Sequence, residues 1–138
     1  MAQTQEPVRE DSPQIEGQEM ILTLPWPPSV NRYWRQVNGR AILSAEGRRY
    51  KQEVSACCIF VGAKPLSGPV AVDIIAVRPD KRRRDLDNLL KATLDSLTPW
   101  VWEDDSQVVD LRIRWAPEAE MIRGGKPHGR LIVSVCNA

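Results

Sequence analysis

Apolar residues gather in short runs along the chain, and the spacing within each run predicts an element. Residues 20–24 form an apolar run that predicts a first strand, which Pro25 ends because proline cannot donate to a strand ladder. Residues 70–77 are rich in β-branched side chains and predict a core strand. Residues 107–115 alternate, and 130–135 form another apolar run, so both predict strands. The side chains expected on one face of the third strand are Val109, Leu111, Ile113 and Trp115.

Two further segments carry apolar residues at helical spacing. Ser44 is a good N-cap and Gly62 fits a C-terminal stop, so we expect a helix between them. Arg48 and Arg49 lie on the face opposite the apolar stripe of this helix, and we expect that face to be solvated. A second helix is expected from Asp85 to about Leu97. The apolar stripes of the two helices are Tyr50, Val54, Cys57, Cys58 and Val61, and Leu86, Leu89, Leu90, Leu94 and Leu97.

The elements follow one another in the order β-α-β-α-β-β. This order predicts a single α+β domain over residues 19–138, with a mixed β-sheet flanked by two helices. Residues 33–43, which contain the turn-forming pair Asn38-Gly39, are expected to form an irregular hairpin or an extended loop. Residues 1–18 are poor in large apolar side chains, so we expect a disordered N-terminal tail.

Composition narrows the environment in which the chain works. The net charge is only +1, so any affinity for nucleic acid must come from local basic patches. Three cysteines make no disulfide framework, and one histidine without a Cys-x-x-Cys pair argues against structural zinc. No apolar run approaches the roughly 20 residues that span a bilayer, and the N-terminus lacks the features of a signal peptide. We therefore expect a cytoplasmic protein with no membrane partner.

The stretch from Arg82 to Lys91 combines residue types suited to phosphate chemistry. Arg82, Arg83 and Arg84 lead directly into Asp85, and Asp87 and Lys91 follow. Arginine binds phosphate through its planar fork of donors, and clustered carboxylates bind hard divalent cations. On a helix, Asp87, Lys91 and Asp95 would share one face at a spacing of four residues.

A third carboxylate, Asp105, lies near the start of the following strand and could converge with Asp85 and Asp87 at the end of the sheet. Two carboxylates about 4 Å apart repel by roughly 4 kcal/mol at an effective dielectric constant of about 20. A converging trio therefore needs a counterion: a metal, Lys91 or the arginines. Oxygen-only ligands point to Mg²⁺, with Mn²⁺ as a substitute, rather than zinc.

Each of these features also has an ordinary structural explanation. Aspartate in a first helical turn is favoured by the helix dipole, and Asp87 with Lys91 matches a routine surface ion pair. Arginine runs are often only solvated. The joint occurrence of the arginines, the three carboxylates and Lys91 is what favours phosphodiester chemistry.

Four motifs together resemble the RusA family of Holliday-junction resolvases, small endonucleases of bacteria and their prophages. The resemblance covers about residues 21–135. The motifs are Leu24-Pro25-Trp26-Pro27-Pro28 leading to Asn31-Arg32-Tyr33, Ser44-Ala45-Glu46-Gly47, Arg82-Arg83-Arg84-Asp85-Leu86-Asp87-Asn88-Leu89 with Lys91, and Asp104-Asp105-Ser106-Gln107-Val108-Val109-Asp110.

The resemblance implies that Asp85, Asp87 and Asp105 hold a catalytic Mg²⁺ and that Lys91 is the family's essential lysine. Arg82 to Arg84, with Asn31, Arg32 and Lys126, are expected to contact DNA. Asp104 and Asn88 are expected to support the metal ligands. The interval between Lys91 and the Asp104-Asp105 pair is one residue shorter than the family's pattern, which leaves the choice between these two aspartates open.

The implied function is Mg²⁺-dependent, structure-selective cleavage of four-way DNA junctions by a homodimer, in recombination and repair. A two-fold junction needs two symmetric cuts, which a two-fold dimer supplies. Two other hypotheses remain: a junction-binding protein without hydrolytic activity, and a nuclease that acts on flaps, forks or RNA. The implied location is the bacterial cytoplasm, in association with the nucleoid.

Overall fold

The computed structural model describes residues 19–123 and 126–138 and is built on one four-stranded sheet. The strands lie in the order β1 (Met20–Pro25), β8 (Arg130–Asn137), β4 (Val70–Val77) and β5 (Val108–Trp115). The pair β4–β5 is parallel and the other pairs are antiparallel. The prediction of an α+β domain with a mixed sheet is confirmed; the predicted tail, residues 1–18, lies outside the described residues.

Alternation along the strands places the core on one face of the sheet. In β4 every second side chain from Val70 to Ala76 is buried, and the same holds for β8 from Leu131 to Val135. Leu22 and Leu24 of β1 extend this face. Side chains in the intervening positions point to the opposite face of the sheet.

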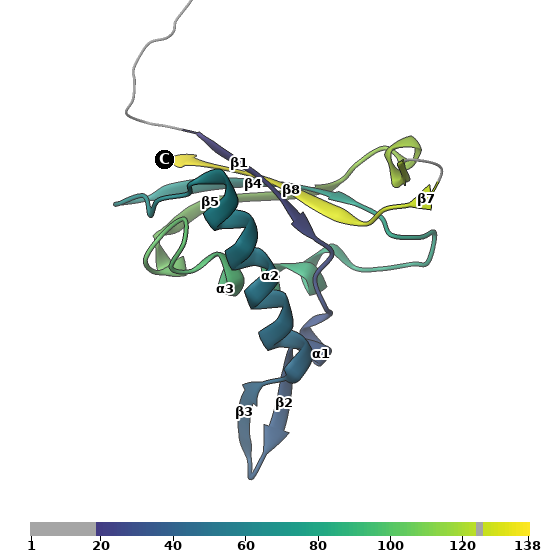
Figure 1. The fold of residues 1–138 in the computed structure, drawn as a ribbon, viewed down its shortest axis with the longest axis horizontal. Coiled ribbons are helices and arrows are strands. Elements are labelled where there is room, and N and C mark those ends of the chain that lie inside the picture. The colour runs from purple at the N-terminus through teal and green to yellow at the C-terminus, as the bar shows by residue number, and fades with distance from the viewer. Residues whose placement is uncertain (1–18, 124–125) are drawn as a thin grey trace, which may run out of the picture.

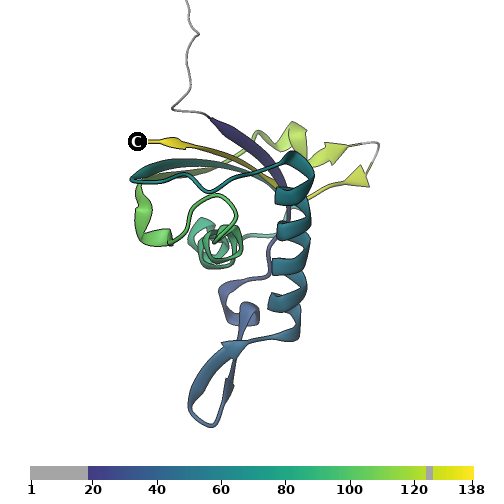
Figure 2. The ribbon, with the colours of Figure 1, turned by 60° about the vertical axis from the view of Figure 1, so that its left-hand side comes forward.

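Two helices, α2 (Ala45–Val61) and α3 (Leu90–Leu97), pack together beneath this face (Figures 1 and 2). The predicted ends of α2 are confirmed. The Ser44 hydroxyl accepts a 2.9 Å hydrogen bond from the Gly47 amide, and Gly62 adopts the left-handed conformation at φ 71°. The Tyr50 hydroxyl donates to the Pro25 carbonyl at 2.9 Å, which fixes α2 to the end of β1.

The second predicted helix exists, but its first turn is tighter than an α-helix. Residues Leu86–Leu89 form the 3₁₀ segment η3, and only Leu90–Leu97 are α-helical. Asp85 precedes η3 in an extended conformation, and its side chain makes no capping hydrogen bond. The Asn88 amide instead donates to the Asp85 carbonyl at 3.2 Å, the i to i+3 pattern of a 3₁₀ turn.

Residues 34–43 form a hairpin, so the hairpin alternative is correct and the extended loop is wrong. The short helix α1 (Val30–Tyr33) leads into β2 (Trp34–Val37) and β3 (Arg40–Leu43). Asn38 and Gly39 have φ values of 51° and 75°, as a two-residue hairpin turn requires. The hairpin projects beyond α2, at the end of the molecule away from the main sheet (Figure 1).

The expectation that Val109 shares a face with Ile113 and Trp115 is wrong. Val70 pairs with Val108 but Ala71 pairs with Asp110, so Val109 is the extra residue of a bulge. Val109 is 63% exposed as a result.

The structure also adds short elements to the predicted order. Besides α1, β2 and β3, these are η4 (Asp105–Gln107), η5 (Glu118–Met121), β6 (Ile122–Arg123) and β7 (Lys126–Pro127). No helix in the described ranges is long and apolar enough to cross a membrane.

Candidate active site

The arginine run and the first aspartate line one cavity of about 830 Å³ beside the start of α2. Three segments form its wall: the turn after β1, the outer face of α2, and the loop that leads from β4 into η3. Asp85 and Asn88 therefore share a cavity with all three arginines and with Arg32, as the sequence predicts. The lining residues are Trp26, Pro27, Pro28, Ser29, Arg32, Glu46, Arg49, Tyr50, Glu53, Arg82, Arg83, Arg84, Asp85, Asn88 and Leu89.

Arg49 and Trp26 are cavity residues that sequence reasoning missed. Arg49 was expected on a merely solvated helix face, but it lies one position before the buried Tyr50 and lines the cavity. The sequence signal that could have placed Arg49 was the Ser44 cap, because the start of α2 determines which way each later side chain points. Arg32 is also less free than expected, because its guanidinium lies 3.0 Å from the Glu46 carboxylate.

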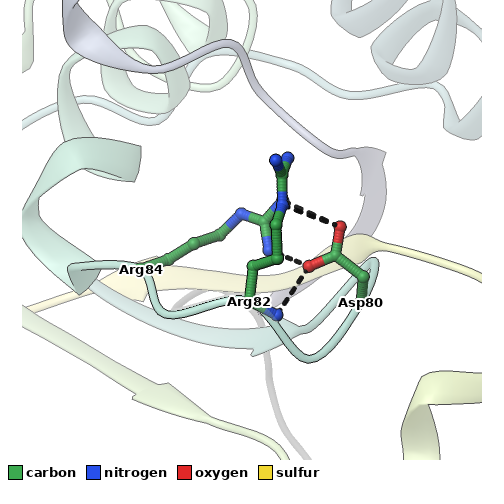
Figure 3. Close-up of polar contacts among 3 residues, drawn as sticks. All are labelled: Asp80, Arg82 and Arg84. Atoms are coloured by element: carbon green, nitrogen blue, oxygen red, sulfur yellow. Dashed lines mark hydrogen bonds and ion pairs between the residues drawn. The ribbon is translucent and has the colours of Figure 1, made fainter.

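The three arginines differ in their surroundings (Figure 3). Arg84 binds Asp80 with both terminal nitrogens, one of them at 3.1 Å, and its side chain is only 20% exposed. The Arg82 side chain is 79% exposed and its Nε lies 3.5 Å from Asp80. Arg83 is exposed. The Arg84 guanidinium holds the pKa of Asp80 well below its usual range.

Lys91 and Asp95 lie four residues apart within α3 and so share one of its faces, as predicted, whereas Asp87 lies in the 3₁₀ turn before it. The 3₁₀ turn rotates Asp87 relative to α3, and the described residues contain no ion pair between Asp87 and Lys91. Asp95 accepts a hydrogen bond from Tyr33 of α1 and lies 3.5 Å from Lys51 of α2. Burial and the bond to Asp95 raise the pKa of Tyr33. Lys91 lies over the ring of Trp34, 5.8 Å from its centroid.

The second acidic segment separates the roles of its two aspartates. Asp104 is the N-cap of η4, and its carboxylate accepts a 3.0 Å hydrogen bond from the Ser106 amide, which lowers its pKa. The Gln107 side chain completes a capping box and donates to the carbonyls of Leu66 and Gly68, both at 2.8 Å. Asp105 lies in the first turn and is exposed. The structure thus uses Asp104 as a cap and leaves Asp105 facing solvent.

The buried Trp102 anchors this segment. Its indole N–H donates to the Thr98 hydroxyl at 2.7 Å, and its backbone forms a bridge with Leu66. Asp105 lies in η4, directly before β5, and Asp87 lies in η3. Since β5 contacts η3, the strand that follows Asp105 packs against the segment that contains Asp87.

The expected convergence of three carboxylates is not present in the structure. Over residues 19–123 and 126–138, no three His, Cys, Asp or Glu side chains are grouped as metal ligands. The donor chemistry nevertheless fits a hard cation, because Asp85, Asp87 and Asp105 are all exposed and offer only oxygen.

One other predicted DNA contact lies away from the cavity. Asn31 is exposed on α1 and lines a separate shallow hollow beside Trp34 and Arg35. Lys126 lies in the short strand β7.

Comparison with known proteins gives the family. The model of the family described as endodeoxyribonuclease RusA matches residues 25–135. The chain belongs to this family. A crossover junction endodeoxyribonuclease of Enterobacteria phage 82 is 47% identical over 109 residues, which cover 76% of this chain and 87% of the relative. The proteins of the same name from Shigella sonnei and Escherichia coli K12 are each 46% identical over 110 residues, with the same coverage. The resemblance predicted from four motifs is confirmed.

Proposed function

We propose that this protein is an endodeoxyribonuclease that resolves four-way DNA junctions by paired phosphodiester hydrolysis. The observation that carries the proposal is the cavity in which Asp85 and Asn88 lie beside exposed arginines. Relatives named crossover junction endodeoxyribonucleases support the choice of substrate.

The proposed catalytic groups are Asp85, Asp87 and Asp105 as ligands of Mg²⁺, or of Mn²⁺ in its place. When bound, the ion would polarise the scissile phosphate and favour ionisation of an attacking water. Lys91 is proposed to stabilise negative charge that develops on the phosphate. Trp34 contacts Lys91 and therefore limits the directions in which the ammonium group can point. Asn88 lines the same cavity as Asp85 and is proposed to support the ligands.

The proposed DNA contacts are local, as the net charge of +1 requires. Arg82 and Arg83 are exposed at the cavity, and Arg49, which is also exposed, lines it too. Asn31, Arg32 and Lys126 are proposed to extend these contacts. Arg84 was expected to grip phosphate too, but its guanidinium is already bound to Asp80.

The protein is proposed to act as a homodimer, since paired cuts need two sites. The C-terminal turn of α2 exposes consecutive apolar side chains, with Phe60 90% exposed, and α2 packs against the edge strand β1. No strand of the described residues pairs with the outer edge of β1, whose sequence Met-Ile-Leu-Thr-Leu-Pro has no charge. The opposite edge strand, β5, is protected by charged residues and a bulge. We place the dimer contact at Phe60 and β1.

Sedimentation analysis tests this contact. Phe60→Asp should shift the protein toward the monomer, and Val109→Asp, which changes an exposed apolar residue at the other edge, should leave the dimer intact. A Phe60→Asp protein that stays dimeric places the contact elsewhere.

The activity is tested with a synthetic four-way junction. Wild-type protein should cut it in the presence of Mg²⁺, and Asp87→Asn should abolish cutting while junction binding persists, because the arginines remain. Asp110→Asn is the matched control, since Asp110 pairs with Ala71 on the face of the sheet opposite the helices. Binding without cutting by the wild-type protein would indicate an inactive junction-binding protein. Faster cutting of flaps or forks would indicate another branched substrate.

The proposed location is the bacterial cytoplasm, where junction DNA occurs at the nucleoid. The relatives come from bacteria and a bacteriophage, which supports this location and a prophage origin.

A further inference from the structure

Asp80 organises the loop between β4 and η3 through its contacts with Arg82 and Arg84 (Figure 3). Its Oδ1 accepts the Arg82 backbone N–H at 2.9 Å, which closes a tight turn. The same carboxylate accepts both terminal nitrogens of Arg84 and lies 3.5 Å from the Arg82 Nε. One side chain thus fixes the backbone at residue 82 and the side chain at residue 84.

Aromatic stacking fixes the other side of Arg84. Its guanidinium carbon lies 5.7 Å from the ring centroid of Trp26, which stacks on Trp115 at 6.2 Å with an interplanar angle of 17°. Arg78 covers Trp115 at 4.0 Å. Trp26 follows β1, Arg78 follows β4 and Trp115 ends β5. The stack therefore connects Arg84 to the ends of three strands.

We propose that Asp80 and Arg84 are positioning residues that hold Asp85 at the cavity, and that Arg84 does not contact DNA phosphate. Arg84 immediately precedes Asp85, and its side chain ties that position to the sheet. Fork-shaped arginine–carboxylate pairing is geometrically restrictive, so it fixes orientation as well as distance. The exposed Arg82 and Arg83 then face the substrate. This inference rests on the proposed junction-cutting function.

Salt dependence of binding distinguishes the two roles for Arg84. The logarithm of the binding constant falls linearly with the logarithm of the salt concentration, and each phosphate contact makes this negative slope steeper by about 0.9. A fluorescent synthetic four-way junction in EDTA reports this slope without cutting. Arg83→Gln is the matched control. It removes one contact from each protomer of the proposed dimer and should make the negative slope shallower by about 1.8. Arg84→Gln should leave the slope unchanged.

Cutting, unlike the salt dependence of binding, should change when Arg84 is replaced. Loss of a side chain that orients a metal ligand typically lowers metal affinity or activity by about 10- to 100-fold, and we expect this loss for Arg84→Gln and Asp80→Asn. Arg84→Lys should also cut slowly, because an ammonium group cannot pair with both carboxylate oxygens. Circular dichroism and thermal unfolding identify any variant that fails to fold. If Arg84→Gln does not fold, Arg84→Lys is tested in its place.

The possible outcomes separate this inference from the proposed function. A wild-type protein that neither binds nor cuts junctions defeats the proposed function. Given an active wild-type protein, a negative slope that becomes shallower by about 1.8 in Arg84→Gln identifies Arg84 as a phosphate contact and overturns the inference. Normal cutting by folded Arg84→Gln, Arg84→Lys or Asp80→Asn overturns it as well.

Discussion

Gly47 offers a substitution for which helix propensity and packing predict opposite signs. Gly47 lies in the first turn of α2, where alanine is intrinsically favoured over glycine by about 1 kcal/mol. A Cβ at this position would lie 2.6 Å from the Tyr33 carbonyl oxygen and 2.9 Å from a methyl of Leu43. The first contact is with backbone, so a side-chain rotation cannot relieve it.

The magnitude follows from what must move. Overpacking of this kind typically costs about 1–3 kcal/mol. The Tyr33 carbonyl also accepts hydrogen bonds from the Ser44 amide and hydroxyl, both at 3.0 Å, and a shift that weakens one costs about 1 kcal/mol more. The helix-propensity gain offsets about 1 kcal/mol of this total. Gly47→Ala should therefore reduce the free energy of unfolding by about 1–3 kcal/mol.

Urea denaturation followed by circular dichroism measures the effect. With a slope of about 1–3 kcal/mol per molar urea, the midpoint should fall by roughly 1 M. Ala56→Gly, at an exposed position of the same helix, isolates the propensity contribution and should cost about 1 kcal/mol. A Gly47→Ala protein as stable as the wild type would refute the reasoning, because the junction between α1 and α2 would then yield without cost.

Three further predictions concern titration and the acidic segment. Burial raises the pKa of both tyrosines, Tyr33 and Tyr50, so the folded protein should show no tyrosinate absorbance step near pH 10. The stability that the two buried neutral hydroxyls contribute should be present below about pH 10 and be lost above it. Burial also raises the pKa of Cys58 to about 11, so at pH 8 only about one thiol in a thousand is ionised and a thiol reagent should modify it only on unfolding. Asp104→Asn should keep cutting because asparagine also caps, whereas Asp105→Asn should lose it; equal loss in both, measured on the junction, would contradict the separation of roles.

Local patterns predicted the elements of the fold because each depends on residues close in sequence. The Ser44 cap and Gly62 stop define α2, and alternation defines β4 without knowledge of its partners. The bulge at Val109 was not predictable in this way, since it is a property of the register between β4 and β5. The 3₁₀ turn at Leu86–Leu89 was missed for a related reason: helical spacing does not distinguish a first turn with i to i+3 hydrogen bonds from an α-helical one.

The candidate site likewise has a part that neighbouring residues predict and a part that depends on tertiary packing. Residue types and their order predicted that Asp85 and the arginines lie together, because they are neighbours in the chain. Arg49 joins them only through the packing of α2 against β1, which brings a distant segment to the cavity.

The alternative partners of a charged side chain also explain why a charge pattern does not assign roles by itself. Arg84 satisfies the sequence criterion for a phosphate contact as well as Arg83 does, but Asp80 and Trp26 occupy its guanidinium. Asp104 satisfies the criterion for a metal ligand as well as Asp105 does, but the η4 cap occupies its carboxylate. In each pair of neighbours, one side chain is bound within its own loop, and the other is the exposed group that we propose to contact substrate or metal. The roles that we propose therefore follow from which charged side chains the fold binds internally, and not from residue type alone.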